Sequence, residues 1–147
     1  MRIRKLVGVA MVIAVLASII VTGAAQAAVA PSPTAPPAPK VTALALPFAW
    51  VDTAFPVLVI VKNQADCDIE DPQICIDVPD GCVLELPEDE CVEPWFGIGA
   101  NGYAFAIWFV SCPMETDELP ISVCVMGEVC GGQMTPACDS VEIEVWE

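Results

Sequence analysis

Short runs of alternating apolar and polar side chains limit the fold of this chain more than any other feature of its sequence. In residues 56–63, Val57, Val59 and Val61 share one face, and Lys62 lies on the other. The same period of two recurs in three later runs, at residues 73–78, 120–126 and 140–146. No helical period persists in this region, so helices are not expected. Strands with one apolar and one wet face are typical of antiparallel sheets packed as a sandwich.

Turn signals separate the alternating runs. The clearest are Pro79-Asp80-Gly81, Asn101-Gly102 and Cys130-Gly131-Gly132, because proline, asparagine and glycine fit the backbone angles of tight turns. The expected strands are residues 41–46, 56–63, 73–78, 82–86, 103–112, 120–126 and 140–146. Residues 47–55 are expected to form an extra edge strand or a bend. About seven short strands predict an all-β, immunoglobulin-like antiparallel β-sandwich.

The N-terminal third has a different character. Residues 1–27 combine a basic start, an apolar stretch and the small-x-small end Ala25-Gln26-Ala27, which predicts a signal peptide. An uncleaved membrane anchor is the alternative, because the apolar stretch is just long enough to span a bilayer. Residues 28–40 form a proline-rich linker, which leaves residues 41–147 as the folded domain. The chain is therefore expected to be secreted or held at the cell surface.

Eight cysteines and no histidine occur in the chain. They lie at positions 67, 75, 82, 91, 112, 124, 130 and 138, and none forms a Cys-x-x-Cys pair. An even count in an exported chain predicts up to four disulfides rather than a zinc or iron–sulfur site. Chain direction in a sandwich favours bridges from Cys67 and Cys75 toward Cys124, Cys130 or Cys138. It also favours a pair at the opposite end that involves Cys82, Cys91 or Cys112.

The order of strands and turns resembles a known family. The segments VLVIVKNQADC, ICIDVP, GIGANGYAFAIWFV, ISVCVMG and VEIEV follow one another as in CARDB-type domains, the cell-adhesion-related, immunoglobulin-like modules of bacterial and archaeal surface proteins. On that pattern Asn63 matches the asparagine that ends the valine-rich strand, and Gly102 and Trp108 match the later turn and strand. The resemblance implies an extracellular module, and it carries no fixed catalytic residues.

The charge of the chain restricts its partners. All 20 acidic residues lie at or after Asp52, and only Lys40 and Lys62 remain basic once residues 1–27 are removed, which gives a net charge of −18. Nucleic acids and anionic membranes need basic patches, so neither is an expected partner. The membrane enters only if the N-terminal segment is an uncleaved anchor. The acids either keep the surface soluble or suit a salty exterior.

One acidic loop is a candidate calcium site. Asp66, Asp68, Glu70 and Asp71 alternate closely enough to converge on one hard cation. A solvated loop is the alternative, because Asp71 stands where an EF-hand loop needs glycine. Enzyme classes are disfavoured, because the chain has no histidine to pair with serine or cysteine and its cysteines are expected to be oxidised. No cofactor is predicted.

The aromatic residues offer the best hint of an interaction. Trp50, Trp95, Phe96, Tyr103, Trp108 and Trp146 are candidates for a sugar-binding platform, with burial in a sandwich core as the alternative. Both faces of residues 103–112 are apolar, so this strand is either covered on both sides or presents an apolar face to a partner. The sequence thus predicts a non-catalytic, exported structural or adhesion module whose partner is another surface or extracellular protein. The alternative is a secreted protein that binds a divalent cation or a protein through disulfide-bonded acidic loops.

Overall fold

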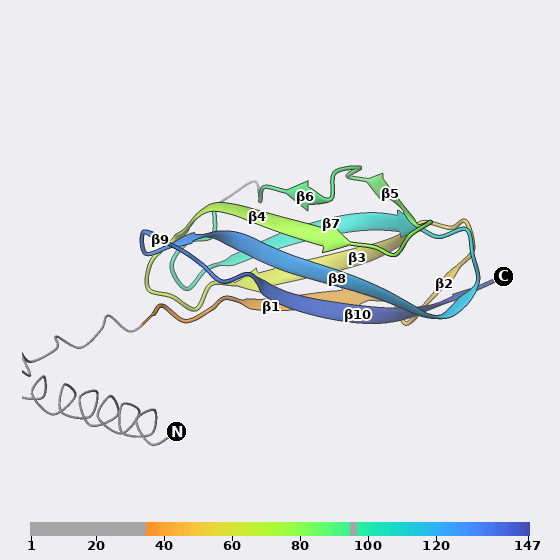
Figure 1. Ribbon diagram of the computed structural model, residues 1–147, viewed down its shortest axis with the longest axis horizontal. Helices are drawn as coiled ribbons and strands as arrows, with labels where there is room; N and C mark the ends of the chain where they lie inside the picture. The colour runs from red at the N-terminus through yellow and green to blue at the C-terminus, as the bar shows by residue number, and fades with distance from the viewer. Residues whose placement is uncertain (1–34, 95–96) are drawn as a thin grey trace, which may run out of the picture. The chain divides into compact units, whose positions relative to one another are not determined.

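Two β-sheets pack face to face in the part of the chain that the computed structural model describes, residues 35–94 and 97–147 (Figure 1). The predicted signal peptide and residues 28–34 of the predicted linker lie outside these residues. No helix in the described residues is long and apolar enough to cross a membrane. The all-β sandwich predicted from the alternating runs is confirmed.

The smaller sheet has four antiparallel strands in the order β1-β3-β7-β5. These are β1 (Lys40–Ala45), β3 (Phe55–Lys62), β7 (Tyr103–Ser111) and β5 (Val83–Leu86). Strand β3 pairs with β7 over its whole length, from Phe55 opposite Val110 to Lys62 opposite Tyr103. Because β3 and β7 are central, their inward side chains meet the middle of the core.

The larger sheet has six strands, in the order β2-β10-β8-β4-β6 with β9 paired to β8. These are β2 (Phe48–Trp50), β10 (Ala137–Trp146), β8 (Thr116–Val129), β4 (Ile69–Asp77), β6 (Cys91–Val92) and β9 (Gly132–Gln133). All its pairs are antiparallel except β2 with β10, which run parallel. The segment 47–55 thus supplies a short edge strand, one of its two predicted conformations.

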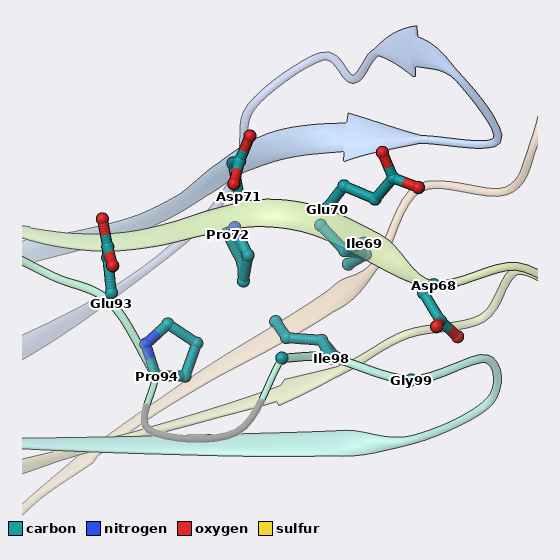
Figure 2. Close-up of a pocket in the computed structure, with 10 residues that line it drawn as sticks. Asp68, Ile69, Glu70, Asp71, Pro72, Glu93, Pro94, Ile98 and Gly99 are labelled. Atoms are coloured by element: carbon teal, nitrogen blue, oxygen red, sulfur yellow. The ribbon is translucent and has the colours of Figure 1, made fainter.

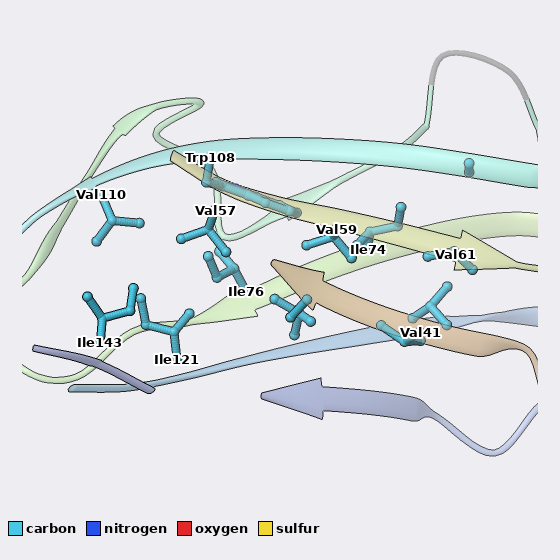
Figure 3. Close-up of a cluster of buried hydrophobic side chains, with 14 of the residues drawn as sticks. Val41, Val57, Val59, Val61, Ile74, Ile76, Trp108, Val110, Ile121 and Ile143 are labelled. Carbon is cyan, nitrogen blue, oxygen red and sulfur yellow. The ribbon is translucent and has the colours of Figure 1, made fainter. Parts of the chain in front are cut away.

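The core lies between the sheets, as the alternation predicts (Figure 3). Val57, Val59 and Val61 of β3 are fully buried, and so is Trp108 of β7. The larger sheet contributes Ile74, Ile76, Ile121, Val123, Val125, Ile143 and Val145. Two predicted inward residues, Val78 and Val141, are only half-buried. Val78 lies beyond the end of β4.

Several strand boundaries were wrong. Strand β4 begins at Ile69 rather than at residue 73, and β8 runs from Thr116 to Val129 rather than from 120 to 126. The start of β4 was hidden by Glu70, Asp71 and Pro72, where a register shift interrupts the pairing with β8. An irregular stretch of this kind breaks the alternating pattern. The two-residue strands β6 and β9 carry no pattern at all and were missed.

All eight cysteines are paired in four disulfides. Cys67–Cys130 joins the loop after β3 to the loop after β8, and Cys82–Cys112 joins the start of β5 to the end of β7. Both agree with the ends predicted for them. The remaining bridges are Cys75–Cys91 and Cys124–Cys138. The prediction for Cys75 was wrong, because Cys91 lies on the neighbouring strand β6 and not in a separate loop.

Candidate functional surfaces

A buried asparagine organises the loops at one end of the sandwich. Asn63, the first residue after β3, is fully buried. Its Nδ2 donates to the carbonyl oxygens of Cys67 at 2.7 Å and Gly99 at 3.0 Å, and its Oδ1 accepts from the N–H of Ala65 at 3.0 Å. One side chain therefore fixes the loop that carries Cys67 and ties it to the loop before β7.

The other residues of the family pattern also have structural roles. A side chain at Gly102 would place its Cβ 2.9 Å from the carbonyl oxygen of Gly99, so only glycine fits this turn. Trp108 is fully buried, and its Nε1 donates to the carbonyl oxygen of Asp89 at 3.0 Å. Asn63, Gly102 and Trp108 thus hold the fold together and do not form a reactive site.

An open hollow of about 690 Å³ lies beside the same loops. Ile69, Pro72, Pro94 and Ile98 line its middle, and four carboxylates, those of Asp68, Glu70, Asp71 and Glu93, lie around it (Figure 2). Figure 2 shows these carboxylates pointing in different directions. The hollow is acidic, but its charges do not converge on one point.

The predicted calcium residues are spread rather than gathered. Asp66 accepts a hydrogen bond from Asn101 Nδ2 at 3.0 Å, and Asp68 accepts one from the N–H of Ala100 at 2.8 Å. Glu70 and Asp71 are exposed on β4. Among the described residues, no group of three or more histidine, cysteine, aspartate or glutamate side chains is arranged to hold a metal ion. Asp66 and Asp68 instead join the two loops that Asn63 also connects.

The outer face of the four-stranded sheet is apolar. Phe105 and Ile107 of β7 point away from the core and are 61% and 47% exposed, and Leu44 of β1 is 47% exposed. Cross-strand pairing places Ile60 beside Phe105, and places Leu58 between Leu44 and Ile107. We call this surface the outer apolar face; its members are Leu44, Pro56, Leu58, Ile60, Leu86, Phe105, Ile107 and Phe109. Of the two predictions for residues 103–112, the structure therefore shows the exposed apolar face.

Acidic residues are rare on this sheet. Strands β1, β3 and β7 contain none, and β5 contains one, Glu85, which accepts a hydrogen bond from Ser111 Oγ. The two lysines of these strands, Lys40 and Lys62, are register partners at one end of the sheet. Lys62 Nζ lies 5.6 Å from the centre of the Tyr103 ring. The outer face of the six-stranded sheet instead carries exposed acids, which include Glu70, Asp77, Glu118, Glu142 and Glu144. One side of the sandwich is therefore acidic and hydrated, and the other is mainly apolar.

The aromatic residues do not gather into one platform. Trp108 is in the core and Tyr103 lies near Lys62, while Trp95 and Phe96 lie outside the described residues. Trp50 and Trp146 do meet, at the edge of the six-stranded sheet, together with Phe48. The sequence prediction missed Phe48, which only the pairing of β2 with β10 brings to this cluster.

Comparison with known proteins identifies the fold. No family model matches the sequence, and no curated protein matches it. Among solved structures, the CARDB domain of the PF1109 protein from Pyrococcus furiosus, in complex with di-metal ions, superposes with a TM-score of 0.57 at 13% identity. That match covers 78% of this chain and 98% of the other. A cohesin module from the family 33 glycoside hydrolase of Clostridium perfringens superposes with a TM-score of 0.54 at 9% identity, covering 74% of this chain and 98% of the module.

These similarities confirm the resemblance to CARDB domains at the level of the fold. Both superpositions extend over nearly the whole length of the other domain, so the likeness concerns the complete sandwich and not a shared hairpin. Identities of 9% and 13% show the architecture and no particular ligand. The described chain has the immunoglobulin-like β-sandwich fold that these CARDB and cohesin domains also have.

Proposed function

We propose that this protein is an exported, non-catalytic module that binds another extracellular or surface protein through its outer apolar face. The exposure of Phe105, Ile107 and Leu44 beside one another is the observation that carries the proposal. Contiguous exposed apolar patches on soluble proteins mark interaction sites. Adhesion or surface assembly is the role that such a module would serve.

The distribution of charge supports a protein partner. A net charge of −18 is more than enough to keep the sandwich in solution, yet no acid interrupts β1, β3 or β7. Aromatic residues are enriched and acids depleted in the buried centres of protein interfaces. Phe105 and Phe109 beside Ile107 have that composition.

The four disulfides support export. Disulfides form and persist in oxidising compartments, and the chain begins with the pattern of a signal peptide. In the alternative in which residues 1–27 remain as a membrane anchor, the proline-rich linker would hold the domain away from the membrane. All eight cysteines are oxidised and histidine is absent, so the usual nucleophile and base pairs cannot form.

Photo-cross-linking from the outer apolar face tests the proposal. A benzophenone amino acid is placed at position 107, and in a matched variant at position 122, where Ser122 lies on the outer face of the other sheet. In the cells that produce the protein, we expect a discrete cross-linked partner from position 107 and none from position 122. Excess unlabelled domain should compete for the cross-link, and a Phe105→Lys domain should not.

Three outcomes would contradict the proposal. Equal cross-linking from positions 107 and 122 would mean that the outer apolar face is not a preferred contact. Cross-linking only to a second copy would show self-association in place of a distinct partner. Equal competition by the Phe105→Lys domain would show that the partner binds elsewhere.

A further inference from the structure

A cluster of three exposed aromatic side chains lies at the edge of the six-stranded sheet, away from the outer apolar face. Phe48 and Trp50 belong to β2, and Trp146 belongs to β10. The parallel register places Trp146 opposite Trp50, and Glu144 opposite Phe48. These side chains share the outer face of the sheet, because Ala49 and Val145 between them point into the core.

Two of the rings stack, and the third meets them edge-on to form a corner. The planes of Trp50 and Trp146 meet at 85° with their centres 6.1 Å apart, and Phe48 lies nearly parallel to Trp146 at 21° and 5.8 Å. Trp50 is 50% exposed, and Phe48 and Trp146 are each 45% exposed. We call Phe48, Trp50, Trp146 and Glu144 the aromatic corner. The ring faces carry the negative end of the aromatic quadrupole, and about half of each side chain is open to solvent.

A carboxylate is built into the corner. Trp146 Nε1 donates to Glu144 Oε2 at 3.1 Å, which holds this negative charge beside the rings. Glu142, on the same outer face of β10, is also exposed. The basic residues of the described chain are Lys40 and Lys62. They are register partners at the start of β1, next to Asn63. No cation of the described chain is therefore placed to occupy the corner.

We propose that the aromatic corner binds the guanidinium or ammonium group of a basic polypeptide segment. Aromatic faces attract such cations, most strongly when the ring is that of tryptophan. The charge of −18 draws a basic segment toward the domain, and Glu144 supplies the local counter-charge. The charges around the corner thus select a cation, whereas a neutral sugar would use only the flat ring faces.

This inference does not depend on the proposed function. The aromatic corner lies on β2 and β10 of the six-stranded sheet, and the outer apolar face lies on the four-stranded sheet. Loss of binding at one surface would leave the other intact. Variants at Phe105 and at Trp50 therefore separate the two proposals.

Tryptophan fluorescence and calorimetric titration of the purified protein test the inference, with a capped tri-arginine peptide as the probe. Tri-citrulline is the matched control, because citrulline keeps the shape of arginine without its charge. We expect saturable binding of tri-arginine that weakens as salt is added, and no binding of tri-citrulline. Binding should weaken about three- to fivefold in Trp50→Leu and in Trp146→Leu.

Two charge variants distinguish the corner from general attraction to an acidic protein. Glu144→Gln removes the carboxylate of the corner, and Glu128→Gln removes one at the opposite end of the sheet, where Glu128 pairs with Gln133 of β9. We expect Glu144→Gln to weaken tri-arginine binding. The change in the logarithm of the affinity caused by Glu128→Gln should be less than half of the change caused by Glu144→Gln. Both variants keep all three rings, so the comparison survives if a tryptophan variant fails to fold.

Several results would overturn the inference. Equal affinity for tri-arginine and tri-citrulline would remove the role of charge. Equal weakening by Glu144→Gln and Glu128→Gln would show unspecific attraction to the acidic surface. Binding of a neutral oligosaccharide such as cellotetraose, lost in Trp50→Leu, together with no site-specific binding of tri-arginine, would identify a sugar platform instead.

Discussion

The side-chain nitrogen of Asn63 lies 2.7 Å from the carbonyl oxygen of Cys67, the residue whose sulfur is bonded to Cys130. A buried amide and a disulfide therefore hold the same loop from two sides. The amide also reaches the carbonyl oxygen of Gly99 in the loop that precedes β7. The position of β7, which carries the outer apolar face, is thus coupled to the loop after β3.

Asn63→Ala should lower the free energy of unfolding by about 1–3 kcal/mol. The substitution leaves the buried N–H of Ala65 and the carbonyl oxygen of Cys67 without their hydrogen-bond partner. Urea unfolding measures the loss. Gln133→Ala is the control, because its amide makes an exposed hydrogen bond to Glu128, and it should change stability by less than about 0.5 kcal/mol. Similar losses in the two variants would contradict the role given to Asn63.

The four disulfides should contribute unequally to stability. Cys67–Cys130 closes a loop of 63 residues and Cys124–Cys138 one of 14. The chain-entropy model gives about 4 kcal/mol for the longer loop and about 3 kcal/mol for the shorter one. Replacing each pair by serine and measuring unfolding in urea tests the order. A larger loss from the 124/138 pair would show that entropy in the unfolded chain does not control the effect.

Trp108→Ala should destabilise the domain by about 3–5 kcal/mol, the cost of a large cavity in a core. The side chain is fully buried between the sheets, and its loss also leaves the carbonyl oxygen of Asp89 without its donor. Tyr103→Ala is the control on the same strand, because Tyr103 is exposed. Thermal and urea unfolding of the two variants should differ clearly, and equal stabilities would contradict the core packing.

Calcium should not stabilise the domain specifically. Asp66 and Asp68 are engaged by Asn101 and Ala100, and the carboxylates around the hollow point apart. We expect about 1 mM calcium to raise the melting temperature no more than magnesium does at equal ionic strength. A calcium-specific rise that is lost in Asp68→Asn would contradict this and would establish the secreted cation-binding alternative.

The period of two in the sequence was enough to predict the inward residues of β3 and most of those of the larger sheet. Val57, Val59 and Val61 alternate along β3 with half-buried residues, because one face of the sheet is packed and the other is not. The partner of Cys75 could not be predicted in the same way. Cys75 lies directly opposite both Cys91 and Cys124 in the sheet, and only the existence of β6 makes the first of these bridges possible.

The candidate surfaces were partly visible in the sequence. The two apolar faces of residues 103–112 indicated either burial or a binding surface, and the choice depended on whether a third layer covers Phe105 and Ile107. The aromatic corner was not predictable, because Phe48 and Trp146 are far apart in the chain. They meet only through the parallel pairing of β2 with β10, which no local pattern specifies.

The central claim is that the outer apolar face is a binding surface, and one dissociation constant tests it most directly. The protein cross-linked at position 107 is purified, and its Kd is measured for the wild-type domain, Phe105→Lys and Ser122→Lys. Phe105 is 61% exposed, so the first substitution should leave stability within about 0.5 kcal/mol of wild type. A Kd at least about 30-fold weaker for Phe105→Lys, with Ser122→Lys unchanged, is the predicted result. The same Kd for all three domains would contradict the claim.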